Sequence, residues 1–191
     1  DTTRFNAGGH CGRLQELQWD GTVVWDWTYA SDEHLQHHDL VQTPYGTLLF
    51  IAYELKTRGD CIAAGRHPGH LNKDGLWSDF VVEIAPQKPA GAEVVWEWHA
   101  WDHLIQDVDP DADNYGNIAE HPERIDLNFD LRRAPPSDKQ VADMKALGYI
   151  AANAGPAEMN ADWLHTNAID YNADLDQIVL SSPHMSEIWI L

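Results

Sequence analysis

A strand motif that occurs twice is the strongest constraint on the fold of this chain. Residues 23–27 read VVWDW, and residues 94–98 read VVWEW. β-Branched and aromatic residues of this kind, bounded by turn residues, are typical of β-strands. A second motif also recurs: HHDLVQTPYGTLLF from His37 and HTNAIDYNADLDQIVL from His165 both place His-x-Asp/Asn before two apolar runs. Recurrence at intervals of tens of residues indicates an architecture built from repeated units.

The repeated unit contains four strands. SDFVVEI from Ser78 is matched by SEIWIL from Ser186, which supplies the third strand of each unit. In chain order, a strand opened by His-x-Asp/Asn is followed by a Leu/Ile run, by the Ser-Asp/Glu strand and by the Val-Val-Trp strand. Four-stranded antiparallel units of this kind are the blades of β-propellers. The predicted fold class is therefore all-β, a β-propeller.

The chain contains parts of three such blades. Residues 37–98 are predicted to form one complete blade, residues 1–27 the end of the preceding blade, and residues 161–191 three strands of the next. Residues 104–160 form a largely irregular insertion, in which the only expected helix spans residues 137–149 behind a Ser137 cap. About two and a half blades do not close a ring, since propellers contain about four to eight. We therefore expect a fragment, with the remaining blades in the same chain or in another.

Charge and cysteine content exclude some functions. The chain has 31 acidic and 12 basic residues, a net charge of −19, which disfavours nucleic acids and anionic membranes because both require a positive field. No apolar run reaches the roughly 18 residues of a transmembrane helix. Cys11 and Cys61 fit no zinc spacing, and either a disulfide or two free thiols is compatible with the sequence.

The histidines provide the candidate site. Innermost strands of successive blades converge on the propeller axis, so the His37 and His165 segments should meet in the central channel. His103 follows the fourth strand of its blade and His184 the second strand of the next, and both are expected at the same channel mouth. Isolated histidines such as His121 are expected to be structural. The predicted site residues are His37, His38, Asp39, His103, His165, Asn167 and His184.

Two chemistries suit this set of side chains. Neutral imidazoles bind transition metals, which predicts a metal-binding or non-catalytic ligand-binding propeller. Hydrogen-bonding imidazoles also stabilise an oxyanion during group transfer. A separate stretch, DVDPDADNYG, provides oxygen ligands of the kind that calcium prefers, although it lacks the glycine and glutamate of an EF-hand loop. Its candidate ligands are Asp107, Asp109, Asp111 and Asp113, and the alternative is a solvated acidic loop.

Four segments resemble the arylsulfotransferase family of secreted bacterial β-propellers. They are HHDLVQTPYGTLLF, EVVWEWHAWDHLIQD, DNYGNIAEHPERIDLN and DWLHTNAIDYNADLDQIVLSSPHMSEIWIL. The resemblance implies a six-bladed propeller in the periplasm or outside the cell. It also implies transfer of a sulfuryl group from an aryl sulfate to a phenol, through a sulfohistidine and without a required cofactor.

The resemblance assigns roles to individual positions. His165 and Asn167 match a His-x-Asn motif that binds the sulfuryl oxygens, and either His37 or His38 matches the histidine of an earlier inner strand. Pro183, in the string Ser-Ser-Pro-His that ends at His184, stands where the family carries an arginine. The histidine that carries the sulfuryl group is implied to lie on a later blade, beyond Leu191.

Overall fold

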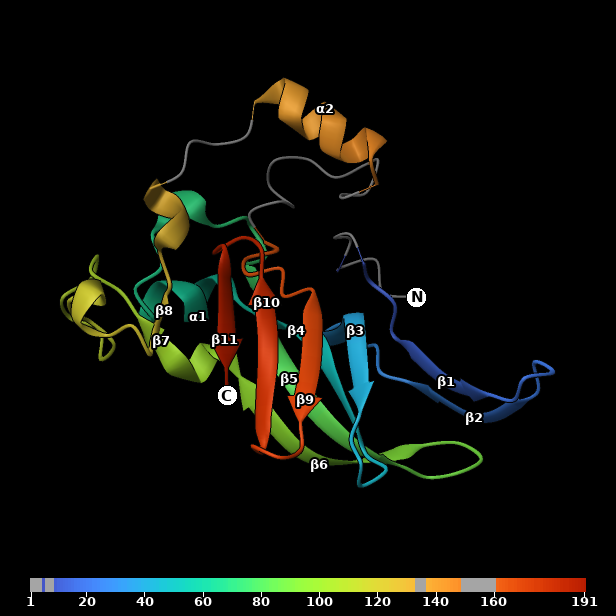
Figure 1. Ribbon diagram of the computed structural model, residues 1–191. Helices are drawn as coiled ribbons and strands as arrows, with labels where there is room; N and C mark the ends of the chain where they lie inside the picture. The colour runs from blue at the N-terminus through green and yellow to red at the C-terminus, as the bar shows by residue number, and fades with distance from the viewer. Residues whose placement is uncertain (1–4, 6–8, 133–136, 149–160) are drawn as a thin grey trace.

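The centre of the molecule is a four-stranded antiparallel sheet in which consecutive strands are neighbours (Figure 1). The computed structural model describes residue 5 and residues 9–132, 137–148 and 161–191. The strands of this sheet are β3 (His34–Gln42), β4 (Leu48–Lys56), β5 (Leu76–Pro86) and β6 (Ala92–His99). The sheet has the strand order of the predicted blade, and it begins three residues earlier than the predicted range of 37–98.

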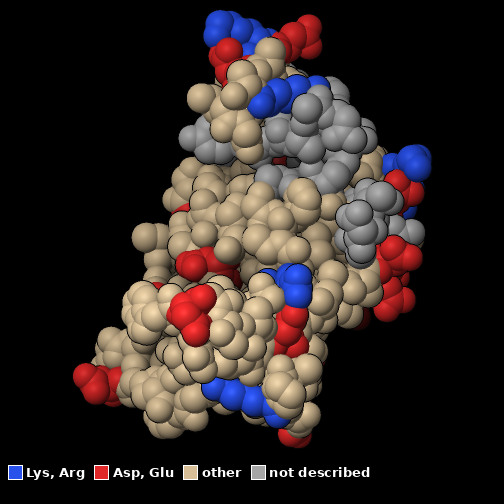
Figure 2. All heavy atoms as spheres, turned by 90° about the vertical axis from the view of Figure 1, so that its right-hand side faces the viewer, with Lys and Arg blue, Asp and Glu red and all other residues tan. Residues whose placement is uncertain are grey.

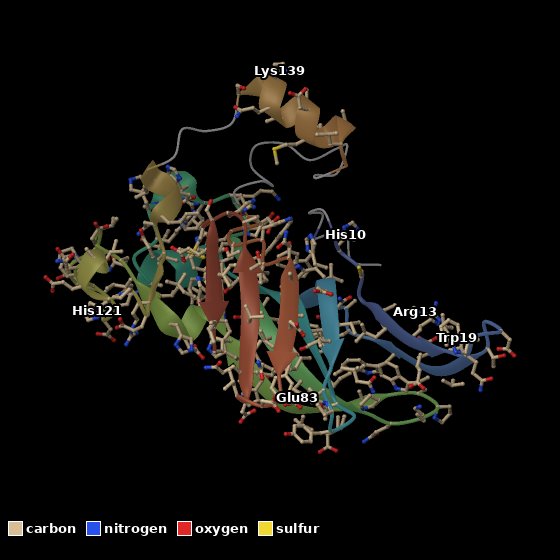
Figure 3. The ribbon with its side chains drawn as sticks, viewed as in Figure 1. His10, Arg13, Trp19, Glu83, His121 and Lys139 are labelled. Carbon is tan, nitrogen blue, oxygen red and sulfur yellow. The ribbon has the colours of Figure 1, made fainter. Side chains whose placement is uncertain are left out.

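Two further antiparallel sheets flank the central one. A hairpin of β1 (Arg13–Leu17) and β2 (Val23–Thr28) lies on one side, and its tip carries Trp19, which is fully exposed (Figure 3). On the other side β9 (Ala168–Asn172), β10 (Gln177–Ser182) and β11 (Glu187–Ile190) form a three-stranded sheet. The fold is thus mostly β and antiparallel, and no sheet among the described residues closes on itself. The number of blades stays a prediction.

Apolar residues alternate along β4 and bury both faces of the central sheet. Phe50 and Ala52 point to one face of the sheet, where they pack with Trp25 of the hairpin. Leu49 and Ile51 contact the other face, against the sheet of β9 to β11. Side chains on a strand point alternately to opposite faces, and a fully buried large apolar side chain contributes about 1.5–3 kcal/mol. The alternation therefore holds three sheets together in one stack.

The insertion between β6 and β9 contains short elements. The 3-10 turns are η2 (Ala100–His103), η3 (Ile118–Glu120) and η4 (Phe129–Arg132), and β7 (Leu104–Ile105) pairs in parallel with β8 (Ile125–Asp126). Helix α2 (Asp138–Ala146) begins at Ser137, whose hydroxyl accepts a hydrogen bond from the N–H of Gln140. This confirms the predicted helix and its cap. Figure 1 shows α2 at the edge of the molecule, away from the sheets.

A second helix was not predicted. Helix α1 (Arg58–Ala63) and the 3-10 turn η1 (Pro68–His70) lie in the connection between β4 and β5. The expectation of a single helix was therefore wrong. A capping box, in which Thr57 and Asp60 bond each other's backbone N–H, begins α1. This reciprocal pairing stabilises a first turn that would otherwise leave its N–H groups unsatisfied.

The structure shows how the charged side chains are distributed over one face and where the two cysteines lie. On the face shown in Figure 2, acidic and basic side chains lie in small groups, several of which contain both kinds, with uncharged surface between the groups. Cys11 is an exposed free thiol and Cys61 a buried one, so the free-thiol alternative describes this structure. Among the described residues, no helix is long and apolar enough to cross a membrane.

Candidate functional site

Four imidazoles form a continuous row where the central sheet meets the segment before β9. Nδ1 of His37 and Nδ1 of His38 are 3.0 Å apart, so one donates a hydrogen bond to the other. The His38 ring meets the His165 ring edge to face, with centroids 4.7 Å apart. His165 in turn stacks on His184 at 5.0 Å. The row brings together four of the predicted residues. His37, His38 and His165 come from the two copies of the repeated motif, and His184 lies in the turn after the second copy.

Unusual backbone geometry sets the direction of two of these rings. His38 and His165 have φ angles of +50° and +51°, and a β-bulge interrupts β3 between His37 and Leu40. A left-handed conformation in a residue other than glycine costs about 1–3 kcal/mol, and such residues concentrate at functional sites. At both positions the strained backbone conformation therefore sets the direction in which the imidazole leaves the main chain.

A short segment before β1 packs against the row. The carbonyl of Gly9 accepts a hydrogen bond from the N–H of His38 at 2.8 Å, and His10 pairs with His37 across the edge of β3 (Figure 3). A Cβ atom on Gly9 would lie 2.3 Å from the His38 ring. Only glycine fits at this position without displacing that ring.

Two buried carboxylates lie beside the row, and neither was predicted as a site residue. Asp162 accepts a hydrogen bond from Nδ1 of His165 through Oδ2. Oδ2 of Asp79 accepts the backbone N–H of Thr166 at 2.6 Å, and its Oδ1 is 3.5 Å from Nε2 of His37. A carboxylate three residues before His165, and another at the start of β5, were the available signals in the sequence.

The surroundings move the pKa values of two imidazoles in opposite directions. Burial, with the neighbouring charges of His37 and His165, lowers the pKa of His38 to about 4. Burial also acts to lower the pKa of His165, but the hydrogen bond and charge of Asp162 outweigh it and raise that pKa. At neutral pH His38 is therefore uncharged, whereas His165 holds a proton more tightly than a free imidazole.

His37 and His184 are each held by one further contact. The ring of His37 stacks face to face on Tyr53 at 3.6 Å. Nδ1 of His184 lies 3.1 Å from the carbonyl oxygen of Trp163. A carbonyl only accepts, so Nδ1 of His184 carries the hydrogen and Nε2 keeps its lone pair in the neutral ring. The site thus combines a basic imidazole, His165, with a neighbouring bare nitrogen, which suits anion binding and proton transfer.

Three predicted residues are placed differently. The Asp39 carboxylate accepts the N–H groups of Leu40 and Ile169, at 2.9 and 3.1 Å, and so links β3 to β9. Asn167 is exposed, and its backbone N–H donates to the carbonyl of Ser181 at 3.0 Å. His103 stacks on Trp98, 5.0 Å away, beside the outer strand β6 rather than in the row.

The candidate metal ligands in the acidic loop and in the imidazole row do not form a metal-binding arrangement among the described residues. Asp109 accepts the N–H of Asp111 at 3.0 Å within the acidic loop. Over the described ranges, no group of three or more His, Cys, Asp or Glu side chains is arranged to hold a metal ion. Calcium in the loop and a metal at the histidines both stay predictions.

Pro183, which the resemblance predicts to stand in place of an arginine, is exposed in the turn between β10 and β11. Arg66, a buried guanidinium, is paired elsewhere: it forms an ion pair with Asp130 and donates to the carbonyl of Leu127 at 2.6 Å. The charged partners described above for the imidazole row are therefore the carboxylates of Asp79 and Asp162.

Comparison with known proteins adds one finding. The sequence model of the family Arylsulfotransferase (ASST) matches residues 21–190. No curated protein and no solved structure matches the chain. The matched range includes all four imidazoles of the row and nearly the whole chain, and this protein therefore belongs to the arylsulfotransferase (ASST) family.

Proposed function

We propose that this protein transfers a sulfuryl group from an aryl sulfate to a phenolic acceptor at the imidazole row. The observation that carries the proposal is the convergence of His37, His38 and His165, from two copies of one motif, with His184 from the turn that follows the second copy. The row faces the central channel of a six-bladed propeller, whose other blades are supplied by the same or another chain. The enzyme acts in the periplasm or outside the cell and requires no cofactor.

The reaction is a double displacement at sulfur. A histidine nitrogen of a later blade donates its lone pair to sulfur, an N–S bond forms, and the S–O bond to the aryl group breaks. The aryl oxygen leaves with both bonding electrons and takes up a proton from protonated His184, which recovers a proton from the acceptor phenol in the second half of the reaction. A phenol then loses its proton, its oxygen attacks sulfur, and the N–S bond breaks, which regenerates the histidine.

The described residues serve these steps through hydrogen bonds and proton transfer. His165 and the amide of Asn167 donate to the sulfuryl oxygens, where negative charge develops. His38, uncharged at neutral pH because burial lowers its pKa to about 4, lines the site without competing for the proton. His184 takes the proton of the acceptor phenol through Nε2, since its Nδ1 is bonded to a carbonyl.

The proposal predicts a gain of activity from one substitution. Pro183 adjoins His184. The charged side chains beside the row, Asp79 and Asp162, are both acidic, so an arginine at position 183 would add a positive charge for binding the sulfate anion. Pro183→Arg should raise kcat/KM for a chromogenic aryl sulfate by about tenfold, which corresponds to about 1.4 kcal/mol of transition-state stabilisation. The measurement uses the natural full-length protein with a phenol as acceptor. Unchanged kcat/KM would contradict anion binding at this end of the row.

Loss of activity tests the row itself. His165→Gln should abolish release of the phenol, whereas His103→Gln, a matched change at an imidazole stacked on Trp98, should leave the rate within about twofold. The intact mass of the wild-type protein, incubated with donor and no acceptor, should increase by one sulfuryl group. Equal rates in the two variants, or no mass increase, would refute the proposal and favour a propeller that binds a ligand without transferring a group.

A further inference from the structure

We infer that Asp162 is a positioning residue for sulfuryl transfer. Its carboxylate accepts the hydrogen on Nδ1 of His165 and stabilises the protonated ring, whose Nε2–H then donates to the substrate anion. The inference rests on the proposed function for the identity of the anion. The pairing of Asp162 with His165 is a property of the protein alone.

The main chain holds Asp162 in place independently of His165. Trp77, at the start of β5, forms a parallel bridge with Asp162, and the N–H of Trp77 donates to the carbonyl of Ala161 at 2.7 Å. Asp162 is 7% exposed, whereas the His165 side chain is 17% exposed. A rigid, buried carboxylate thus meets one edge of a ring that is partly open to solvent, the arrangement by which a second group fixes the tautomer of a functional histidine.

The Asp162 carboxylate interacts with residues of the imidazole row and its surroundings. Oδ2 bonds His165, while Oδ1 is buried. Burial, the charges of Asp162 and Asp79 and a hydrogen bond to Asp162 together raise the pKa of the buried Tyr53 hydroxyl well above its usual range. The Asp162 carboxylate thus bonds a site histidine through one oxygen and acts on the Tyr53 hydroxyl, whose ring stacks on His37.

Asp79 provides the contrast. It is as deeply buried as Asp162, at 3% exposure, but its strongest bond is to a backbone group, the N–H of Thr166 at 2.6 Å. Asp79 therefore fastens the chain and lies beside His37, whereas Asp162 forms a hydrogen bond with His165 itself. Two carboxylates of similar burial beside the same row give a matched pair of variants, Asp162→Asn and Asp79→Asn.

The charges around His165 determine the expected direction of change. It faces the carboxylates of Asp162 and Asp79 and the rings of His38 and His184. An asparagine at 162 accepts the same hydrogen bond but removes the charge, so protonated His165 becomes less stable. His165 should then release its proton at lower pH, and the alkaline limit of activity should move to lower pH with it.

The test follows the ring nitrogens of the histidines by NMR over a pH series, in the full chain without substrate. The midpoint for His165 should fall by about one pH unit or more in Asp162→Asn, the size expected for losing an adjacent opposite charge. Asp79→Asn should shift it by less than half as much, because Asp79 acts only through its charge. Equal shifts in the two variants, or none in Asp162→Asn, would overturn the inference.

Two further measurements keep the result decisive. If Asp162→Asn does not fold, the wild-type titration alone decides, since a His165 midpoint at or below the ordinary value of about 6.5 would refute the pairing. Asp162→Glu, which keeps the charge, should retain a raised midpoint. The pH dependence of kcat/KM is measured separately: if no variant transfers a sulfuryl group, the proposed function fails while the NMR result still decides the role of Asp162.

Discussion

Replacing Asp79 with alanine should loosen the contact between the central sheet and the segment that carries His165. Asp79 lies on β5, and its Oδ2 accepts the N–H of Thr166 at 2.6 Å, with both residues almost fully buried. A hydrogen bond to a charged group contributes about 1.5–3 kcal/mol, and a buried N–H left without a partner costs about 1–3 kcal/mol. We expect Asp79→Ala to lower the free energy of unfolding by about 2–3 kcal/mol.

Urea denaturation of the full chain measures this change. Trp77 and Trp163 are buried near the contact, so tryptophan fluorescence reports its loss. With a denaturant slope of about 2 kcal/mol per molar urea, the midpoint should fall by about 1 M. Asp79→Asn keeps an acceptor for the Thr166 N–H and should lose less than half as much.

A matched control separates this effect from the loss of any carboxylate. The Asp74 side chain is 54% exposed and pairs with Lys73, at 3.2 Å. Asp74→Ala should change the free energy of unfolding by no more than about 0.5 kcal/mol, as is usual for surface substitutions. If Asp79→Ala shifted the midpoint no further than Asp74→Ala, the Thr166 contact would not hold the two segments together.

Two other predictions concern the imidazole row. Gly9 and Gly21 both have positive φ angles, +74° and +87°, but of the two only Gly9 has a neighbour, the His38 ring, that an added Cβ would meet. Gly9→Ala should therefore reduce stability and sulfuryl transfer more than Gly21→Ala. Equal effects of the two substitutions in urea denaturation and in the aryl sulfate assay would contradict this. His38 takes up its proton near pH 4 in the folded protein and near pH 6.5 in the unfolded chain. Because the unfolded chain binds this proton more tightly, acidification from pH 6.5 to pH 4 should destabilise the protein. In His38→Gln the urea midpoint should depend less on pH over this range. His165 acts with the opposite sign, because its raised pKa contributes stability below about pH 6.5 that is lost as the pH rises through the folded-state pKa.

The strands could be predicted because their signals are local and repeated. Alternation along β4 puts Leu49 and Ile51 on one face and Phe50 on the other, and this period is visible in the sequence itself. Helix α1 was missed because six residues are too few for a helical period to emerge. Only its capping box, Thr57 with Asp60, marks its beginning.

The site could be predicted in part for the same reason. His37 and His165 begin the two copies of the repeated motif, and equivalent strands of successive blades converge, so the sequence predicted that the two residues lie close together. The structure places both in one row. The roles of Asp79 and Asp162 depend on how residues 161–166 pack on β5, a contact between distant parts of the chain that no short pattern encodes. His103 was expected at the channel mouth, but the chain turns into η2 at the end of β6 and stacks this ring on Trp98.

The left-handed backbone at His38 and His165 also restricts how this family member can change over time. Asparagine, aspartate and glycine tolerate that conformation, whereas β-branched residues do not. Substitution at these two positions should therefore cost the least stability when one of these three residues enters, and about 1–2 kcal/mol more for other residues. A lineage that lost these two imidazoles would thus tend to acquire asparagine, aspartate or glycine at both positions, and the loss would leave a recognisable mark in the sequence.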